Sequence, residues 1–210
     1  MANNFFNKTN RNVSADHTLP TYVYSVPTSK KTIVIELDVA NRSTSSQTIS
    51  VLIDDFTAKG SNIASTAASI SGNAIVSAAH GFATGDVVRL TKSGSTAIRV
   101  GGVEPPTAGN NTDPVYYVIV ATASTFKLAS SHSNATAGTA LTVTGTTANA
   151  DIWNTLAFTY IVRDAPIPIG GALKVIAGQK LVMEATDSMI VQTSSASSVD
   201  SIASILEDVS

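Results

Sequence analysis

Side chains that commonly carry acid–base or metal chemistry are sparse in this chain. The three histidines, His17, His80 and His132, lie far apart, and no pair of them has metal-ligand spacing. His80 precedes Gly81, a combination more typical of a turn than of a ligand or a catalytic base. The chain has no cysteine, which excludes disulfides, thiolate metal sites and a cysteine nucleophile. We therefore expect no metal and no cofactor.

Carboxylates and serines also form no convincing catalytic pattern. Asp54 and Asp55 are adjacent and offer oxygen ligands to a hard cation. Adjacent residues of a strand point to opposite faces, so a solvated pair at a strand end is the better interpretation. Serine is abundant, but no G-x-S-x-G nucleophile elbow occurs. The few acids and the single Trp disfavour a glycoside hydrolase, and the sequence predicts that the protein is not an enzyme.

The composition describes a weakly charged chain. Its 210 residues are 43% hydrophobic, enough for a normal core, but only 13% are charged, about half of the roughly 25% that is usual. The net charge is -2 and no block of Lys or Arg is present, so we expect no direct nucleic-acid or membrane partner. The N-terminus lacks a signal-peptide pattern, and no apolar run approaches the roughly 20 residues of a membrane helix.

Period-two alternation dominates the elements that would position any site. In residues 33–39 every odd position is apolar, whereas the two acidic residues fall at even positions. Residues 49–53, 158–163 and 181–184 alternate in the same way. Such alternation predicts strands with one face on a core.

Turn chemistry and two ambiguous segments complete the pattern. Residues 166–171 contain two prolines and two glycines, which indicates a turn or an edge segment. Residues 91–114 are rich in Gly and Pro and predict a loop or an extended hairpin. Residues 63–70 fit a loop, a linker or a short strand. Residues 199–209 fit a helix face or a strand, and the strand is favoured because the neighbouring elements are strands.

The composition changes near residue 62 and changes back near residue 152. The stretch between these points is rich in Gly, Ala, Thr and Ser. Short predicted strands recur within it, at residues 86–90, 116–120, 125–129 and 141–144. We expect a small β domain over residues 63–152, inserted into a discontinuous β domain made of residues 1–62 and 153–210.

The middle stretch resembles a known phage module. Four blocks occur in order, namely A-H-G-F-A-T-G-D-V-V at 79–88, Y-Y-V-I-V at 116–120, S-T-F-K-L-A-S at 124–130 and G-T-A-L at 138–141. They resemble a small β-barrel-like module of phage tail and virion proteins, often labelled by its similarity to the first catalytic-cysteine half-domain of ubiquitin-activating enzymes. Without a cysteine, that label implies no such enzymology here.

The blocks also have plain structural interpretations. Gly81 and Gly85 permit the backbone angles of a tight turn, and Asp86 can cap that turn. We therefore expect His80, Gly81, Gly85 and Asp86 to form a structural turn of the insert. The expected core of the insert consists of Phe82, Tyr117, Phe126 and Leu128.

The flanks resemble a second family. Residues 24–27, 31–34 and 39–41, followed much later by 160–168 and 203–207, are similar to small phage virion proteins, including marine cyanophage-like ones, that lack the middle module. The resemblance implies decoration, neck or tail accessory proteins. It also implies an all-β fold, a β-sandwich of jelly-roll or immunoglobulin-like type that carries the inserted small β-barrel-like domain.

Aromatic side chains near the N-terminus are candidate interface anchors. Phe5 and Phe6 lie in a polar arm, and Tyr22 and Tyr24 follow shortly after. An arm that bears two Phe has little reason to exist unless it docks, so we expect it to lie on another chain rather than across its own domain. Trp153 is an alternative anchor, although packing where the insert rejoins the sandwich is the better interpretation.

Together these patterns predict a structural component of a tailed-phage virion. We expect it to bind other virion proteins (capsid, neck or tail) and its own copies as a homo-oligomer, without catalysis. It would be made in the cytoplasm of the host bacterium and located in the virion. The alternative is a receptor- or glycan-binding module of a tail fibre or baseplate. An exposed cluster of aromatic and acidic residues on the insert loops would favour that alternative.

Overall fold

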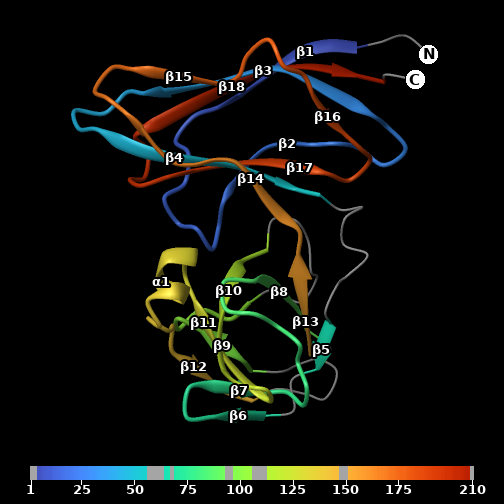
Figure 1. Cartoon of the computed structure of the whole chain (residues 1–210), viewed down its shortest axis with the longest axis vertical. Helices are drawn as coiled ribbons and strands as arrows, with labels where there is room; N and C mark the ends of the chain where they lie inside the picture. The colour runs from blue at the N-terminus through green and yellow to red at the C-terminus, as the bar shows by residue number, and fades with distance from the viewer. Residues whose placement is uncertain are drawn as a thin grey trace. The chain divides into compact units, whose positions relative to one another are not determined.

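The chain divides into two compact units. The computed structural model describes residues 4–55, 64–66, 69–92, 97–105, 113–146 and 151–208. The first unit comprises Met1–Asp16, Pro20–Ala58 and Ala157–Ser210, and the second comprises His17–Leu19 and Lys59–Leu156 (Figure 1). Almost all of the described structure is β, in several antiparallel sheets, which confirms the predicted all-β sandwich class.

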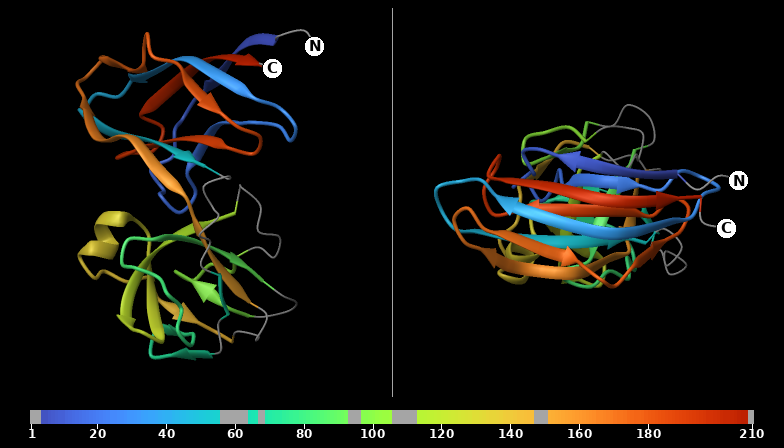
Figure 2. Two further views of the ribbon diagram at one scale, coloured as in Figure 1. Left: turned by 45° about the vertical axis from the view of Figure 1, so that its right-hand side comes forward. Right: turned by 90° about the horizontal axis from the view of Figure 1, so that it is seen from above.

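The first unit is a sandwich of two antiparallel sheets (Figure 2). The five-stranded sheet has the order β1-β18-β3-β15, and β16 also pairs with β3. Its strands are β1 (Asn4–Asn10), β3 (Thr32–Asn41), β15 (Ala172–Ile176), β16 (Leu181–Met183) and β18 (Val199–Glu207). The four-stranded sheet has the order β14-β4-β17-β2. Its strands are β2 (Thr21–Ser25), β4 (Gln47–Asp54), β14 (Phe158–Ile167) and β17 (Ser188–Thr193).

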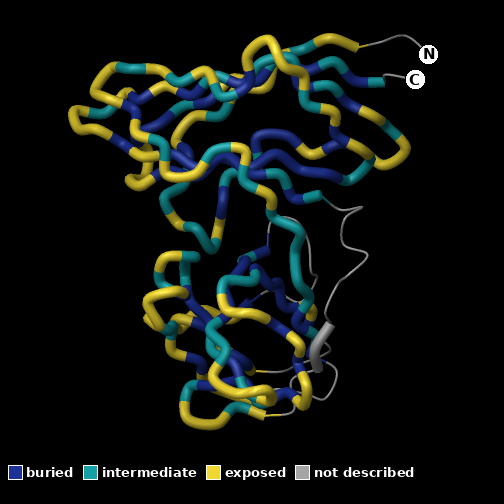
Figure 3. Tube along the Cα trace, viewed as in Figure 1, coloured by how far each residue is buried: buried dark blue, intermediate teal, exposed yellow. Residues whose placement is uncertain are grey.

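Apolar side chains of both sheets form the sandwich core. Leu37 and Val39 come from β3, Ile205 comes from β18, and Val51 and Val191 come from the opposite sheet; all five are fully buried. Burial of each such side chain contributes roughly 1.5 to 3 kcal/mol. Figure 3 shows buried positions along the facing strands of this unit. The sandwich is therefore held together by inward-facing residues from early and late parts of the chain.

The alternation in β3 changes phase halfway along the strand, which corrects the prediction for residues 33–39. Val34 and Leu37 both face the core, whereas Ile33 and Ile35 are only half-buried. The pairing with β18 steps from Val34–Ile205 to Glu36–Ser204, which leaves Ile35 as an extra residue. Such a bulge turns the following residues to the opposite face. The odd positions therefore do not share one face along the whole strand.

Two other predictions for this unit are confirmed. The C-terminal segment is strand β18, which pairs with both β1 and β3. The Pro- and Gly-rich segment 166–171 ends edge strand β14 and then turns, since the Gly171 N–H donates to the carbonyl oxygen of Pro168 at 2.9 Å.

The second unit contains a seven-stranded sheet, a two-stranded sheet and one short helix. The larger sheet has the order β5-β13-β8-β10-β11-β7-β6, and β12 pairs with β9. The strands are β5 (Ala64–Thr66), β6 (Ser69–Ser71), β7 (Ala74–Val76), β8 (Val87–Thr91), β9 (Arg99–Val100), β10 (Val115–Thr122), β11 (Thr125–Ala129), β12 (Val143–Thr144) and β13 (Ile152–Leu156). Helix α1 (His132–Thr136), capped by the Ser131 hydroxyl, was not predicted. Its five residues are too few to show helical periodicity.

Three of the four residues expected to form the core of the insert lie in one hydrophobic cluster. Phe82, Phe126 and Leu128 belong to one buried cluster that also contains Trp153. Tyr117 is fully buried but lies outside that cluster, with its ring edge-on to His132 at 6.4 Å.

The structure describes parts of the two segments 63–70 and 91–114, which the sequence left ambiguous or predicted as loop. Residues 64–66 and 69–71 are strands β5 and β6, while 63, 67 and 68 lie outside the described residues. The expected loop 91–114 contains β9 between two stretches, 93–96 and 106–112, that also lie outside them.

The chain leaves and re-enters the sandwich on neighbouring strands. Asp54 of β4 pairs with Phe158 of β14, and the Asp55 N–H donates to the carbonyl oxygen of Ala157 at 3.1 Å. The units change at residues 58/59 and 156/157, a few residues from the boundaries expected at 62/63 and 152/153. Residues 17–19 join the second unit, where the Val115 N–H donates to the carbonyl oxygen of Thr18.

Candidate interaction surface

Four apolar side chains form a row across the outer face of the five-stranded sheet. Residues directly opposite each other in an antiparallel pair share one face of the sheet. Phe5 of β1 pairs with Leu206 of β18, Leu206 pairs with Ile33 of β3, and Ile33 pairs with Val182 of β16. We call these four residues the apolar row. It joins strands from both ends of the chain.

The apolar row points away from the sandwich core. Its sequence neighbours Val34, Met183 and Ile205 are fully buried in that core, so the row itself lies on the opposite face. Phe5 and Val182 are each 61% exposed, and Ile33 and Leu206 are half-buried. Exposed apolar residues that are contiguous, rather than scattered singly, mark interaction sites.

Beyond the apolar row this outer face is mostly polar, although Ile202 of β18 is also 40% exposed there. Lys174 of β15 donates to the Glu36 Oε1 of β3 at 2.6 Å. That hydrogen bond lowers the pKa of Glu36 and raises the pKa of Lys174. Both side chains are well exposed, so solvent screens the pair and it adds little stability.

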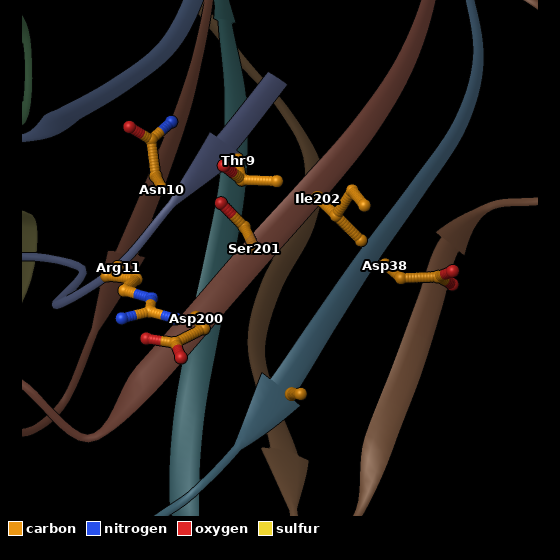
Figure 4. A pocket seen from close by; sticks show the side chains of 8 residues that line it. Thr9, Asn10, Arg11, Asp38, Asp200, Ser201 and Ile202 are labelled. Carbon is orange, nitrogen blue, oxygen red and sulfur yellow. The ribbon is translucent and has the colours of Figure 1, made fainter. Parts of the chain in front are cut away.

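A shallow hollow of about 220 Å³ lies farther along β1, β18 and β3. Thr9, Ile202 and Asp38 lie in succession across these three strands (Figure 4). Asp200 at the rim forms an ion pair with Arg42, 3.0 Å from its Nε, and accepts a hydrogen bond from the Asn12 N–H at 3.1 Å. Its carboxylate is thus engaged in holding the chain after β1.

The N-terminal arm lies on its own domain, which corrects the expectation that it lies on another chain. All seven residues of β1 pair with β18. Phe6 packs edge-on against Tyr24, with ring centroids 6.0 Å apart. The pairing satisfies backbone groups of the arm and covers Tyr24, so folding within one chain is favourable.

The four expected interface aromatics therefore separate into different roles. Tyr24 is only 6% exposed and belongs to the core, so it is not a surface anchor. Phe6 and Tyr22 are half-buried, and Phe5 alone is strongly exposed. Ile33, Val182 and Leu206 were missed, because only the register between distant strands brings them beside Phe5.

Tyr24 also belongs to a polar cluster that holds the last strand. Its hydroxyl donates to Glu207 Oε1 at 2.6 Å, and Lys30 Nζ binds Glu207 Oε2 at 2.7 Å and Asp208 Oδ2 at 2.9 Å. Burial, with the bond to Glu207, raises the pKa of Tyr24 to about 12. The hydrogen bonds from Lys30 and Tyr24 hold the pKa of Glu207 below its ordinary value.

The residues expected to form a turn in the insert lie in one hydrogen-bonded segment, in which His80 is buried and the other three are exposed or half-buried. His80 is 2% exposed, its Nδ1 accepts from the Phe82 N–H at 3.0 Å, and its Nε2 donates to the carbonyl oxygen of Thr122 at 2.9 Å. Gly81 and Gly85 have φ of 71° and 97°. Asp86 Oδ2 accepts from the Ala83 N–H at 2.8 Å. Both His80 nitrogens are thus used in structure.

The other sequence candidates also take structural positions. Trp153 is fully buried in the second unit, edge-on to Tyr116 and Phe126, so it is not an exposed anchor. Asp54 is buried and Asp55 is half-buried. Among the described residues, no group of three or more His, Asp or Glu side chains is arranged to hold a metal ion.

In the part of the chain that the structure describes, no helix has the length and hydropathy needed to cross a bilayer. In comparisons with known proteins, no family model, no curated protein and no solved structure matches the chain. The candidate surface therefore rests on strand register and exposure.

Proposed function

We propose that the chain is a non-enzymatic structural component of a tailed-phage virion, of the capsid decoration, neck or tail accessory type. It binds the particle through the outer face of the five-stranded sheet and also binds its own copies. The observation that carries the proposal is the apolar row, in which Phe5 and Val182 are each 61% exposed. Full burial of a large apolar side chain contributes about 1.5 to 3 kcal/mol.

The composition and the motifs support this role. Interface cores are depleted of charge, and only 13% of this chain is charged. Virion components act in many copies, so modest contacts are multiplied by symmetry. The blocks at 79–88, 116–120 and 124–130, and those at 24–27, 31–34, 39–41 and 160–168, resemble phage virion proteins.

The test replaces one residue of the apolar row and measures incorporation into particles. Val182→Asp places a charge in the row, and we expect the amount of the chain in purified virions to fall about tenfold or more. A tenfold fall corresponds to a loss of only about 1.4 kcal/mol of binding free energy. The chain is quantified by mass spectrometry relative to the major capsid protein.

Ile169→Asp is the matched control, because Ile169 is 65% exposed but lies in the turn after β14. We expect its incorporation to be unchanged. Undiminished incorporation of Val182→Asp would refute the role of the row. Absence of the wild-type chain from virions would refute the proposal altogether. Specific glycan binding by the isolated chain would favour the alternative of a receptor- or glycan-binding module of a tail fibre or baseplate.

A further inference from the structure

The edges of the sandwich sheets differ in how well they are protected from pairing with another chain. Edge strand β14 has two register shifts and contains Pro166. Edge strand β15 has five residues and one register shift, β16 has three residues, and β2 has five residues with a shift in its pairing. Short strands, bulges and prolines all discourage edge-to-edge pairing.

Strand β1 lacks these devices. It has seven residues, pairs with β18 in unbroken register from Asn4 to Asn10, and contains no proline. Its single charged residue is Lys8. Of the described edges of the sandwich, β1 is thus the one that presents a long, regular strand to a partner.

The sequence of β1 matches a second copy of itself. A two-fold axis perpendicular to the sheet pairs two such strands antiparallel and keeps the outer faces on the same side. A ladder centred on Asn7 uses every residue of the strand. The pairs between the two copies would be Asn4 with Asn10, Phe5 with Thr9, Phe6 with Lys8, and Asn7 with Asn7.

Neighbouring registers fit less well. Among the described residues, a ladder centred on Phe6 pairs residues 4–8 of each strand. A ladder centred on Lys8 pairs only residues 6–10 and places the two ammonium groups opposite each other, which is destabilising. The Asn7 register instead places each Lys8 opposite a Phe6 ring. Lys8 Nζ already lies 5.5 Å from the Phe6 ring centroid within one chain, so this pair of side chains is compatible with a cation–π contact.

We infer that a second copy of this chain docks on β1, with the two strands pairing antiparallel about Asn7 to make one continuous sheet. The inference rests on the proposed function and specifies its contact between copies. The two-fold axis leaves both apolar rows on the same face of the pair. Both rows then reach one particle surface together, and bivalent binding strengthens the attachment.

Cysteine cross-linking tests the inference directly, because the chain has no cysteine of its own. We expect full-length Asn7→Cys, mildly oxidised in solution, to form a disulfide-linked dimer on a non-reducing gel. Phe5→Cys and Thr9→Cys, mixed with different tags, should form mainly the mixed dimer. Ile169→Cys, a change at an exposed residue on another segment, should stay monomeric.

Three results would overturn the inference. Cross-linking of Asn7→Cys no better than that of Ile169→Cys would exclude the β1 contact, provided circular dichroism shows an unchanged fold. Preferential cross-linking of Phe5→Cys with Asn7→Cys would instead indicate the Phe6 register and overturn the Asn7 pairing. Cross-linking that wild-type chain in excess does not reduce would indicate random collision.

The same reagents separate this inference from the proposed function. Val182 lies on β16, on the far side of the sheet from β1. In the Asn7→Cys background, Val182→Asp should keep the cross-link while losing particle incorporation. A cross-link in a chain that never enters virions would leave the dimer standing and refute the virion role.

Discussion

At the scale of single residues, His80 shows how a candidate for chemistry can serve structure instead. Both ring nitrogens are engaged with backbone groups, and the ring stacks on Phe82 with centroids 5.4 Å apart. The ring also lies edge-on to Phe126 at 5.3 Å. These contacts leave no ring nitrogen for a substrate. We interpret His80 as the residue that fastens the turn to the neighbouring hairpin.

Replacement of His80 by Ala should therefore lower stability and nothing else. The change leaves the buried Phe82 N–H without its partner, which costs about 1 to 3 kcal/mol. Thr122 is exposed, so water can replace the lost donor to its carbonyl oxygen. Urea unfolding should show a loss of roughly 2 to 4 kcal/mol in the second unit. Lys127→Ala, a change at a half-buried residue of β11, is the comparison and should lower the free energy of unfolding much less. An effect below that of the comparison would refute the fastening role.

At the scale of elements, the Tyr24–Lys30–Glu207 cluster fixes β18, the central strand of the candidate surface. Glu207 has a lowered pKa in the folded chain, so the unfolded chain binds more protons as the pH falls. The stabilisation is complete above the ordinary Glu value of 4.5 and is lost as the pH falls through the lower folded value. Acid should therefore loosen β18.

Substitution of Glu207 by Gln tests this pH dependence. Between pH 5 and pH 3 (roughly, since ordinary Glu groups titrate there), wild-type stability should fall more steeply than that of Glu207→Gln. Urea midpoints measured across this window give the comparison. Parallel pH profiles for the two proteins would show that the carboxylate is not stabilised by Lys30 and Tyr24.

The elements also show what the sequence can and cannot specify. Alternation predicts strands such as β3 and β14, because each strand buries one face. The pattern of residues 199–209 fits a helix face as well, and only the neighbouring strands favour strand β18 there. It does not predict the bulge at Ile35, which depends on the pairing with Ser204 and Ile205. The apolar row is hidden for the same reason, since its members come from four strands whose register is a tertiary property.

At the scale of the whole molecule, the second unit interrupts a pair of neighbouring sandwich strands. Asp55 and Ala157 already face each other across this pair, with the hydrogen bond at 3.1 Å. We expect that replacing residues 56–156 by a two-residue Asn-Gly turn leaves a folded sandwich, because that turn type suits a two-residue hairpin. Circular dichroism should show β structure and cooperative unfolding.

Residues 17–19 belong to the second unit, so the shortened chain should also carry Leu19→Ser, which removes an apolar side chain that is 47% exposed even in the full chain. A soluble product with the circular dichroism of a random coil would contradict the nested arrangement. The control is a chain that keeps the second unit but lacks β1. Its circular dichroism shows whether loss of one edge strand alone unfolds the sandwich.

The position of the chain in a reconstruction of the intact virion tests the central proposal most directly. We expect the outer face of the five-stranded sheet to be covered, with Phe5, Ile33, Val182 and Leu206 in contact with another virion protein. A reconstruction in which this face is open to solvent, while a different surface of the chain holds the particle, would contradict the proposal.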